Sequence, residues 1–214
     1  DIALHYFGKK ITYRELFSMI HLAELKLNEL DIKFEDMVAF IGIYTPEMIA
    51  LFYALNKIGA ISCMMDPRTA PESLAKYIQD ARVKCLFIQD ACCEVAQKVL
   101  MRAEVAQTVV LSTSASMGFP VKYLYSLKKK ITTKKIQFIQ YESIKLRDGG
   151  KNAKEEKKVD NVNDVPAVVC YTGGTTGNSK GVVLSNGNLN SIVEQFRVMT
   201  GGFERQQKWL SPSV

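Results

Sequence analysis

The chain has 214 residues, a formal net charge of +6 and a hydrophobic content of 47%. That length predicts one large domain or one and a half small ones. No apolar run approaches the ~18–20 residues that cross a bilayer, so a membrane-spanning helix is not expected. The five cysteines are odd in number and fit neither a disulfide framework nor a zinc site. The chain begins at Asp1 rather than at methionine, and we expect a trimmed or mature fragment.

The first predicted element is a β-hairpin at residues 4–13. Leu4–Phe7 and Ile11–Tyr13 are short strand-like runs with a glycine in the turn between them. Thr12 and Glu15 then form a capping box, which predicts that a helix begins at this point. Apolar residues in steps of four and three define the buried face of this helix: Leu16, Ile20, Ala23, Leu27 and Leu30.

Repeated strand–helix units follow, over residues 14–141. Met37–Ile43 is continuously apolar, as expected of a strand that is buried on both faces. Thr45 followed by Pro46 predicts the start of a helix, and Gly59 predicts its end. The alternation then continues through strand Ala60–Met65, helix Pro71–Arg82, strand Val83–Ile88, helix Cys92–Ala103 and strand Gln107–Leu111. This pattern predicts an α/β fold with a mostly parallel, helix-covered sheet.

The positive charge is concentrated in residues 121–158, which hold twelve Lys or Arg and four Asp or Glu, a net charge of +8. A helix at 121–130, a strand at 136–141 and a charged surface connector at 145–163 are predicted here. Lysines near a helix C-terminus and in a solvated loop account for the charge, so we expect no nucleic-acid partner. Weak attraction to an anionic membrane surface, at about 1 kcal/mol per basic residue, stays open.

The most informative segment is Tyr171–Gly181, which reads YTGGTTGNSKG. It lies between two apolar runs, Val165–Tyr171 and Val182–Leu184, that predict strands, and a helix is expected at 187–200. Its glycines allow close approach of the backbone, its N–H groups can form an anion site, its threonines supply hydroxyls, and Lys180 adds a positive charge. These groups favour a grip on a polyphosphate over a glycine-rich hairpin without a ligand.

Two common phosphate-binding patterns do not fit this segment. The P-loop requires a second glycine directly before its lysine. Here Lys180 precedes Gly181, and Ser179 stands five positions after Gly174. The dinucleotide pattern G-x-G-x-x-G also fails, because Gly173 and Gly174 are adjacent.

The segment resembles the phosphate-binding signature of the adenylate-forming enzymes, Tyr/Phe-Thr-Ser/Gly-Gly-Thr-Thr-Gly-x-Pro/Ser-Lys-Gly. That superfamily includes acyl-CoA synthetases, adenylation domains of peptide synthetases, and luciferases. Every position matches: Gly173 resembles the fatty acyl-CoA synthetase version, and Ser179 replaces the more usual proline. Ile11–Leu16 and Asn56–Pro67 resemble two further motifs of the family, whose roles look structural.

The resemblance implies that residues 1–214 are part of the N-terminal AMP-binding domain, with the phosphate loop and its flanking strands and helix at 165–202. The rest of that domain and the C-terminal domain would lie outside the chain. The residues implied to contact the ATP phosphates are Thr172, Gly173, Gly174, Thr175, Thr176, Gly177 and Lys180. No catalytic residue or metal ligand is expected in this chain, which alone should be inactive.

The implied function is that of a fragment of an ATP-dependent acyl-CoA ligase. Such an enzyme converts a carboxylate and ATP to an acyl-adenylate and pyrophosphate, and then transfers the acyl group to a thiol. The implied cofactors are ATP, Mg²⁺ and coenzyme A, and a carboxylic acid is the implied substrate. Two alternatives stay open: a fragment of an amino-acid adenylation domain, against which Gly173 and Ile61–Met65 count, and a non-enzymatic phosphate-binding module.

The cysteines give an indication of the cellular compartment of the protein. Cys63, Cys85 and Cys170 lie inside apolar runs and are expected to be buried thiols. Unpaired thiols suit a reducing environment, so a cytoplasmic location is expected.

Overall fold

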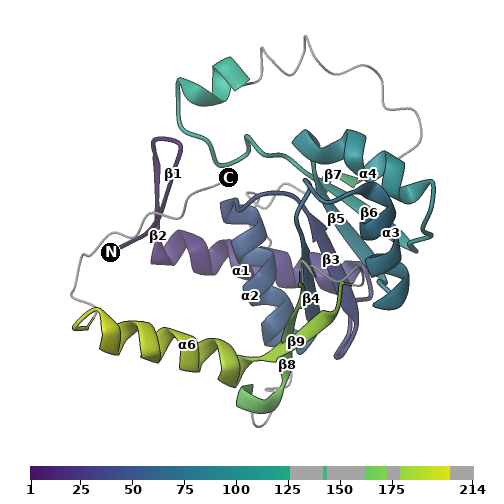
Figure 1. Ribbon diagram of the computed structural model, residues 1–214. Helices are drawn as coiled ribbons and strands as arrows, with labels where there is room; N and C mark the ends of the chain where they lie inside the picture. Colours follow the sequence, from purple (N-terminus) through teal and green to yellow (C-terminus); the bar gives the residue numbers. More distant parts are fainter. Residues whose placement is uncertain (126–141, 144–161, 173–178, 203–214) are drawn as a thin grey trace.

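The computed structural model describes residues 1–125, 142–143, 162–172 and 179–202. These residues form a central sheet flanked by helices, with a small hairpin at the start of the chain (Figure 1). The strands are β1 (Ile2–Tyr6), β2 (Lys9–Thr12), β3 (Met37–Ile41), β4 (Ile61–Met65), β5 (Cys85–Gln89), β6 (Gln107–Leu111), β7 (Glu142–Ser143), β8 (Pro166–Tyr171) and β9 (Gly181–Ser185). The helices are α1 (Tyr13–Glu29), α2 (Pro46–Ile58), α3 (Pro71–Asp80), α4 (Cys93–Leu100) and α6 (Asn186–Met199), with 3₁₀ turns η1 (Asp90–Cys92) and η2 (Val162–Asp164).

Seven of the described strands form the main sheet, in the order β7-β6-β5-β3-β4-β8-β9. All neighbouring pairs are parallel except β8 and β9, which are antiparallel. The predicted α/β fold with a mostly parallel sheet is therefore confirmed. Because β3, β4 and β8 run in the same direction, the loops that follow them emerge at one edge of the sheet, its carboxyl edge.

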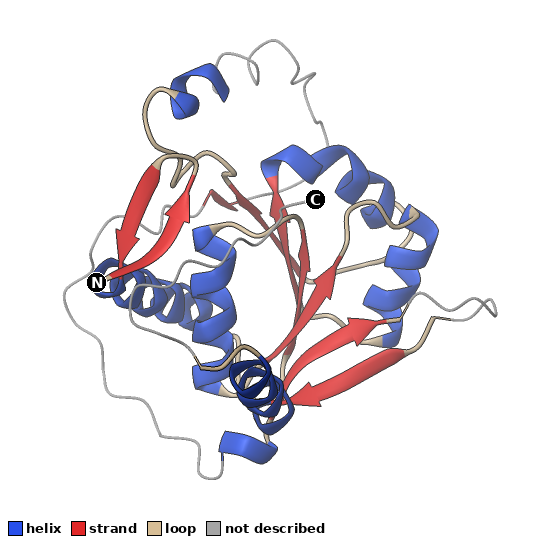
Figure 2. Ribbon diagram, turned by 60° about the vertical axis from the view of Figure 1, so that its left-hand side comes forward, coloured by secondary structure: helices blue, strands red, loops and turns tan. Residues whose placement is uncertain are grey.

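Helices cover both faces of the sheet, as the continuous apolar strands predict (Figures 1 and 2). Val38 and Phe40 of β3 face α1 and α2, where the Phe40 ring stacks on Phe87 with centroids 5.4 Å apart. Ala39 and Ile41 point to the other face and join the cluster under α3 and α4. A strand buried in this way contributes roughly 1.5–3 kcal/mol per large apolar side chain, which makes β3 the centre of the core.

Caps account for the observed starts of α1 and α2 and for the end of α2. Thr12 and Glu15 make the reciprocal capping-box contacts at the start of α1. The Thr45 side chain accepts a hydrogen bond from the backbone N–H of Met48 and begins α2. Gly59 ends that helix at a φ of +73°, and a Cβ there would lie 2.4 Å from the Phe34 ring, so both conformation and space require glycine.

The N-terminal hairpin docks on the loop that follows β6. The hydroxyl of Tyr6 donates to the backbone oxygen of Thr113 (3.1 Å), and the Gly118 N–H donates to the oxygen of Phe7 (3.1 Å). These contacts hold the 112–118 loop between the hairpin and the sheet.

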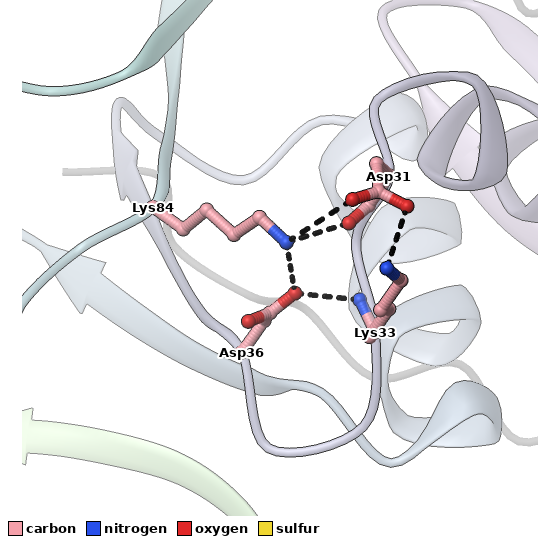
Figure 3. A network of polar contacts seen from close by, with 4 residues as sticks. All are labelled: Asp31, Lys33, Asp36 and Lys84. Atoms are coloured by element: carbon pink, nitrogen blue, oxygen red, sulfur yellow. Dashed lines mark hydrogen bonds and ion pairs between the residues drawn. The ribbon is translucent and has the colours of Figure 1, made fainter.

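A set of ion pairs closes the opposite edge of the sheet, where β3 and β5 begin (Figure 3). The Lys84 ammonium contacts the Asp36 carboxylate and the backbone oxygen of Asp31, both at 2.6 Å. Lys33 donates its backbone N–H to Asp36 (2.7 Å), and its ammonium lies 2.9 Å from the Asp31 carboxylate. The hydrogen bond from the Lys33 side chain lowers the pKa of Asp31. This network joins the α1–β3 connection to the start of β5, far from the carboxyl edge.

The prediction that Cys170 is buried is wrong, whereas Cys63 and Cys85 are buried as expected. Cys170 is the penultimate residue of β8, and its register partner Val182 is also exposed. At this end of β8, α3 packs against the face that carries Tyr171. Cys170 comes one residue earlier, so its side chain points to the other face of the sheet. An apolar run predicted a strand here without showing which part of it a helix covers.

Several smaller expectations differ from the structure or lie outside its described part. α3 and α4 are shorter than predicted: α3 ends at Asp80 rather than Arg82, and α4 spans Cys93–Leu100 rather than Cys92–Ala103. Residues 121–125 are helical, and the rest of the helix predicted at 121–130 is outside the described residues. The same holds for the strand predicted at 136–141 and for most of the connector at 145–163. None of the described helices is both long and apolar enough to cross a bilayer.

Candidate functional site

The candidate site lies where β8 ends and β9 begins, at the carboxyl edge of the sheet. The two strands are antiparallel, with Tyr171 opposite Gly181. Beyond this pair, the Thr172 N–H donates to the backbone oxygen of Lys180 (3.0 Å), and the Thr172 hydroxyl lies 3.4 Å from the same oxygen. The strand ladder thus continues for one more residue on each side, and it brings the first and last predicted phosphate contacts together.

The Thr172–Lys180 pair forms the base of the candidate site. Both of its side chains are exposed. A hydroxyl and an ammonium group at the open end of a strand pair can contact an anion without being withdrawn from water. The other predicted contacts, Gly173, Gly174, Thr175, Thr176 and Gly177, lie outside the described residues. Their roles stay predictions, as do those of Thr172 and Lys180. The prediction that Tyr171 ends a strand is confirmed.

Tyr171 is held by an aromatic stack with α3. Its ring lies parallel to that of Tyr77, with centroids 3.8 Å apart and planes 9° apart. Its hydroxyl donates to the backbone oxygen of Tyr77 (3.1 Å). Burial raises the pKa of the Tyr171 phenol to about 12, with a smaller effect from Cys63. The last residue of β8 is therefore fixed in position immediately before the candidate site.

Sequence reasoning did not identify Tyr77 as part of this site. The helical spacing of Leu74, Tyr77 and Ile78 places all three on the buried face of α3, and that signal was available. What the spacing could not show is which strand end lies beneath the ring.

Gly181 has a steric reason to be glycine. A Cβ at this position would lie 3.2 Å from a methyl carbon of Val169 and 3.3 Å from the Tyr171 ring. A larger residue would press on the ring that stacks against α3. The glycine after Lys180 in the motif thus keeps the base of the site compact.

An ion pair between Arg68 and Asp66 also lies near this edge, in the connection between β4 and α3. The Arg68 guanidinium contacts the Asp66 carboxylate through Nε (3.0 Å to each oxygen) and through a terminal nitrogen (2.6 Å). In open parallel sheets, ligands bind outside the carboxyl ends of the strands, which is where this pair and the candidate site are found. Within the part of the chain that the structure describes, no group of three His, Cys, Asp or Glu side chains could hold a metal ion.

Comparison with known proteins agrees with this arrangement. The sequence matches the family model described as "AMP-binding enzyme" over residues 1–213. It is 28% identical over 201 residues to a long-chain-fatty-acid–CoA ligase of Bacillus subtilis, a match that covers 90% of this chain and 35% of the relative. It is 25% identical over 181 residues to an acetyl-coenzyme A synthetase of Xanthobacter autotrophicus, covering 84% of this chain and 27% of the relative.

A solved structure shows the same fold. The chain superimposes on the N-terminal domain of FACL13 from Mycobacterium tuberculosis with a TM-score of 0.60 and 22% identity, covering 84% of this chain and 38% of that one. This chain therefore spans about a third of the length of the curated relatives named above.

Proposed function

Because this chain belongs to the family of AMP-binding enzymes, we propose that it provides the polyphosphate-binding part of an ATP-dependent acid–thiol ligase. In that reaction a carboxylate oxygen attacks the α-phosphorus of ATP, and the bond to the bridging oxygen of pyrophosphate breaks. The acyl-adenylate then passes its acyl group to the sulfur of coenzyme A, with release of AMP. The observation that carries the proposal is the Thr172–Lys180 pairing, which presents a hydroxyl and a cation of the family signature together.

The chemical task of these residues is electrostatic. Negative charge builds up on the pyrophosphate as it leaves, and oriented N–H groups, hydroxyls and a lysine stabilise that charge. Thr172 and Lys180 are both exposed, so they can reach phosphate oxygens that approach from solvent. We expect neither residue to take part in bond making.

Mg²⁺ fits this scheme as a companion of the nucleotide. Mg²⁺ usually keeps several waters and binds substrate phosphates rather than a cage of protein ligands. The described residues gather no such cage. When bound with ATP, the ion would neutralise phosphate charge, while Thr172 and Lys180 hold the phosphates from the protein side.

A fatty acid is the substrate that we propose, and a CoA thiol the acceptor. The relatives reported above are named for CoA ligation, one of them with long-chain fatty acids, which favours this reading over an amino-acid adenylation domain. Assay of pyrophosphate release by the complete gene product with fatty, short-chain and amino acids distinguishes the two. Release that depends on amino acids alone would contradict the proposal.

We also propose a cytoplasmic location with weak attraction to anionic membranes through residues 121–158. None of the five cysteines, all of which lie among the described residues, forms a disulfide, which suits a reducing compartment. The net charge of +8 on this stretch supports the attraction. Cell fractionation tests the location, and sedimentation with phosphatidylserine vesicles at two salt concentrations tests the attraction. Binding that is insensitive to salt would contradict an electrostatic origin.

The direct test of the phosphate role is Mg-ATP binding and ATP–pyrophosphate exchange. We expect exchange by the complete gene product to depend on a carboxylic acid and to fall when Lys180 is replaced. Exchange that is unchanged by Lys180→Ala would contradict the role assigned to this site.

A further inference from the structure

Arg68 lies in the connection between β4 and α3, next to the strand that carries the candidate site. β4 and β8 are parallel neighbours, and their register pairs Met64 with Cys170. Continuing that register by two residues brings Asp66 level with Thr172. The 66–70 connection therefore leaves the sheet at the same edge as the candidate site, one strand away.

The far end of this connection is fixed as well. α3 begins at Pro71, and its Tyr77 stacks on Tyr171 with ring centroids 3.8 Å apart. Residues 66–70 thus link one neighbour of the site, β4, to another, α3. Adjacent strands lie about 4.8 Å apart, a separation that an arginine side chain can bridge. From the strand order and this spacing, we infer that the Arg68 guanidinium lies within reach of the Thr172–Lys180 pair.

The present partner of Arg68 is easily exchanged. The guanidinium binds the Asp66 carboxylate at 2.6–3.0 Å, but the side chains are 64% and 45% exposed. Exposed ion pairs of this kind are weak, because water screens the charges. The Asp66 carboxylate also accepts the Arg68 backbone N–H at 2.8 Å, which orients the turn independently of the guanidinium.

We propose that Arg68 is a second cation of the polyphosphate site, and that its guanidinium leaves Asp66 to bind phosphate oxygens of the nucleotide held at Thr172 and Lys180. This inference rests on the proposed function. A guanidinium matches a phosphate as well as a carboxylate, because its planar fork donates two parallel hydrogen bonds to either. In the absence of nucleotide, Asp66 neutralises Arg68. When nucleotide binds, the Asp66 carboxylate and the phosphate compete for the guanidinium.

Titration of the chain with inorganic triphosphate, followed by chemical shifts of backbone amides, tests this role. We expect Arg68→Ala to weaken triphosphate binding roughly 5- to 10-fold, the loss of one charge-assisted contact in water. Arg68→Lys should fall between the wild type and the alanine variant, since lysine keeps the charge without the fork. Asp66→Asn should strengthen binding about 2- to 3-fold, because the amide retains an acceptor for the turn and removes the competing charge.

Arg197→Ala is the matched control. Arg197 is an exposed arginine paired with Glu194 at 2.8 Å on α6, so its removal changes the net charge equally. The triphosphate affinity of the Arg197→Ala variant should stay at the wild-type value. An equal loss in Arg197→Ala and Arg68→Ala would mean that only net charge matters and would overturn the proposal. Asp66→Asn binding no tighter than the wild type would also contradict it.

Lys180→Ala separates this inference from the function on which it rests. If Lys180→Ala weakens binding and Arg68→Ala does not, the role of Arg68 is wrong and the proposed function stands. If Lys180→Ala leaves ATP–pyrophosphate exchange by the complete gene product unchanged, the proposed function fails and the role of Arg68 fails with it. Circular dichroism of each variant shows whether it is folded.

Discussion

Thr172 and Lys180 owe their positions to the backbone rather than to side-chain partners. Their N–H and carbonyl groups extend the β8–β9 ladder, and the Thr172 hydroxyl adds a long hydrogen bond to the Lys180 backbone oxygen (3.4 Å). The same residues are exposed, and an exposed lysine contributes little to stability. Single substitutions of Thr172 or Lys180 should therefore change phosphate binding and leave the free energy of unfolding almost unchanged.

Lys180→Ala should slow adenylate formation by about 10²-fold, the typical effect of removing one oriented electrostatic group. The measurement is ATP–pyrophosphate exchange by the complete gene product, with thermal unfolding as a check on folding. Lys98→Ala is the control, because Lys98 is an exposed lysine on α4 whose contact is with Glu94. If both variants lost exchange equally, the specific role of Lys180 would be wrong.

Ser116 forms a hydrogen bond with the buried carboxylate of Glu47. Its hydroxyl donates to Glu47 Oε1, and Glu47 is 4% exposed. The second carboxylate oxygen has no hydrogen-bond partner within the described residues. We expect Ser116→Ala to lower the free energy of unfolding by about 1–3 kcal/mol, because the carboxylate would lose its donor while remaining buried.

Chemical denaturation measures the effect of Ser116→Ala, and Ser191→Ala is the matched control. The Ser191 hydroxyl donates to the Gly187 oxygen on an exposed helix, where water can replace it. That variant should unfold at nearly the wild-type denaturant concentration. Equal effects of the two substitutions would argue against a special cost at Glu47.

At the scale of elements, α3 connects the candidate site to the core. Leu74 and Ile78 lie in the cluster beneath the helix, and Tyr77 extends that buried face to Tyr171. The strand pair β8–β9 is thus tied to the sheet through β4 and to the helix layer through one ring. α6, in contrast, has no buried residue among those described, although Ser185 and Asn188 form a capping box at its start.

The Tyr77 ring should be the important part of that side chain, because the hydrogen bond from Tyr171 goes to its backbone oxygen. Tyr77→Phe is expected to be nearly neutral. Tyr77→Leu should cost about 0.5–1.5 kcal/mol beyond any change in buried area, the value of an aromatic pair. Urea denaturation of the two variants gives the difference. A Phe variant as unstable as the Leu variant would show that the stack contributes nothing.

At the scale of the whole molecule, several raised pKa values link stability to alkaline pH. Burial raises the pKa of Cys63 and of Cys85 from 9.0 to about 12, and that of Tyr171 from 10.0 to about 12. The folded chain therefore holds these protons at a pH where the unfolded chain releases them. Their contribution to stability is complete below about pH 9 and is lost as the pH rises to 12.

We expect the free energy of unfolding to fall steadily from pH 9 to pH 12. Replacement of Cys63 by Ala removes one of the groups with a raised pKa, so the slope over this range should become shallower. Urea denaturation at a series of pH values, with a reductant present, provides the measurement. A slope that is the same in both proteins would contradict the assignment to buried thiols.

The chain alone should bind ATP only weakly. By resemblance, the residues that bind adenine and ribose are not among residues 1–214, and each residue that becomes fixed on binding costs about 1–2 kcal/mol. We expect a dissociation constant no tighter than about 1 mM, near −4 kcal/mol. Calorimetry with Mg-ATP tests this value. A micromolar constant would mean that the site is more complete than the family signature implies.

The elements of this protein were largely readable from its sequence. Local signals decide them: the capping box at Thr12, the Pro46 start and the Gly59 end depend on backbone groups a few residues away. The apolar run Met37–Ile43 predicted a central strand because only a strand covered on both faces tolerates such a run. The phosphate signature was equally local, since its glycines, threonines and lysine lie within one segment.

Contacts between distant segments were decided by the tertiary structure alone. The Tyr77–Tyr171 stack, the position of Arg68 beside the candidate site and the exposure of Cys170 all depend on strand order. Periodicity shows that a side chain is on a buried or exposed face, but not what lies opposite it. That depends on which strands become neighbours, and β8 pairs with β4 across about a hundred intervening residues. Such pairing reflects the packing of the whole sheet, which no short stretch of sequence encodes.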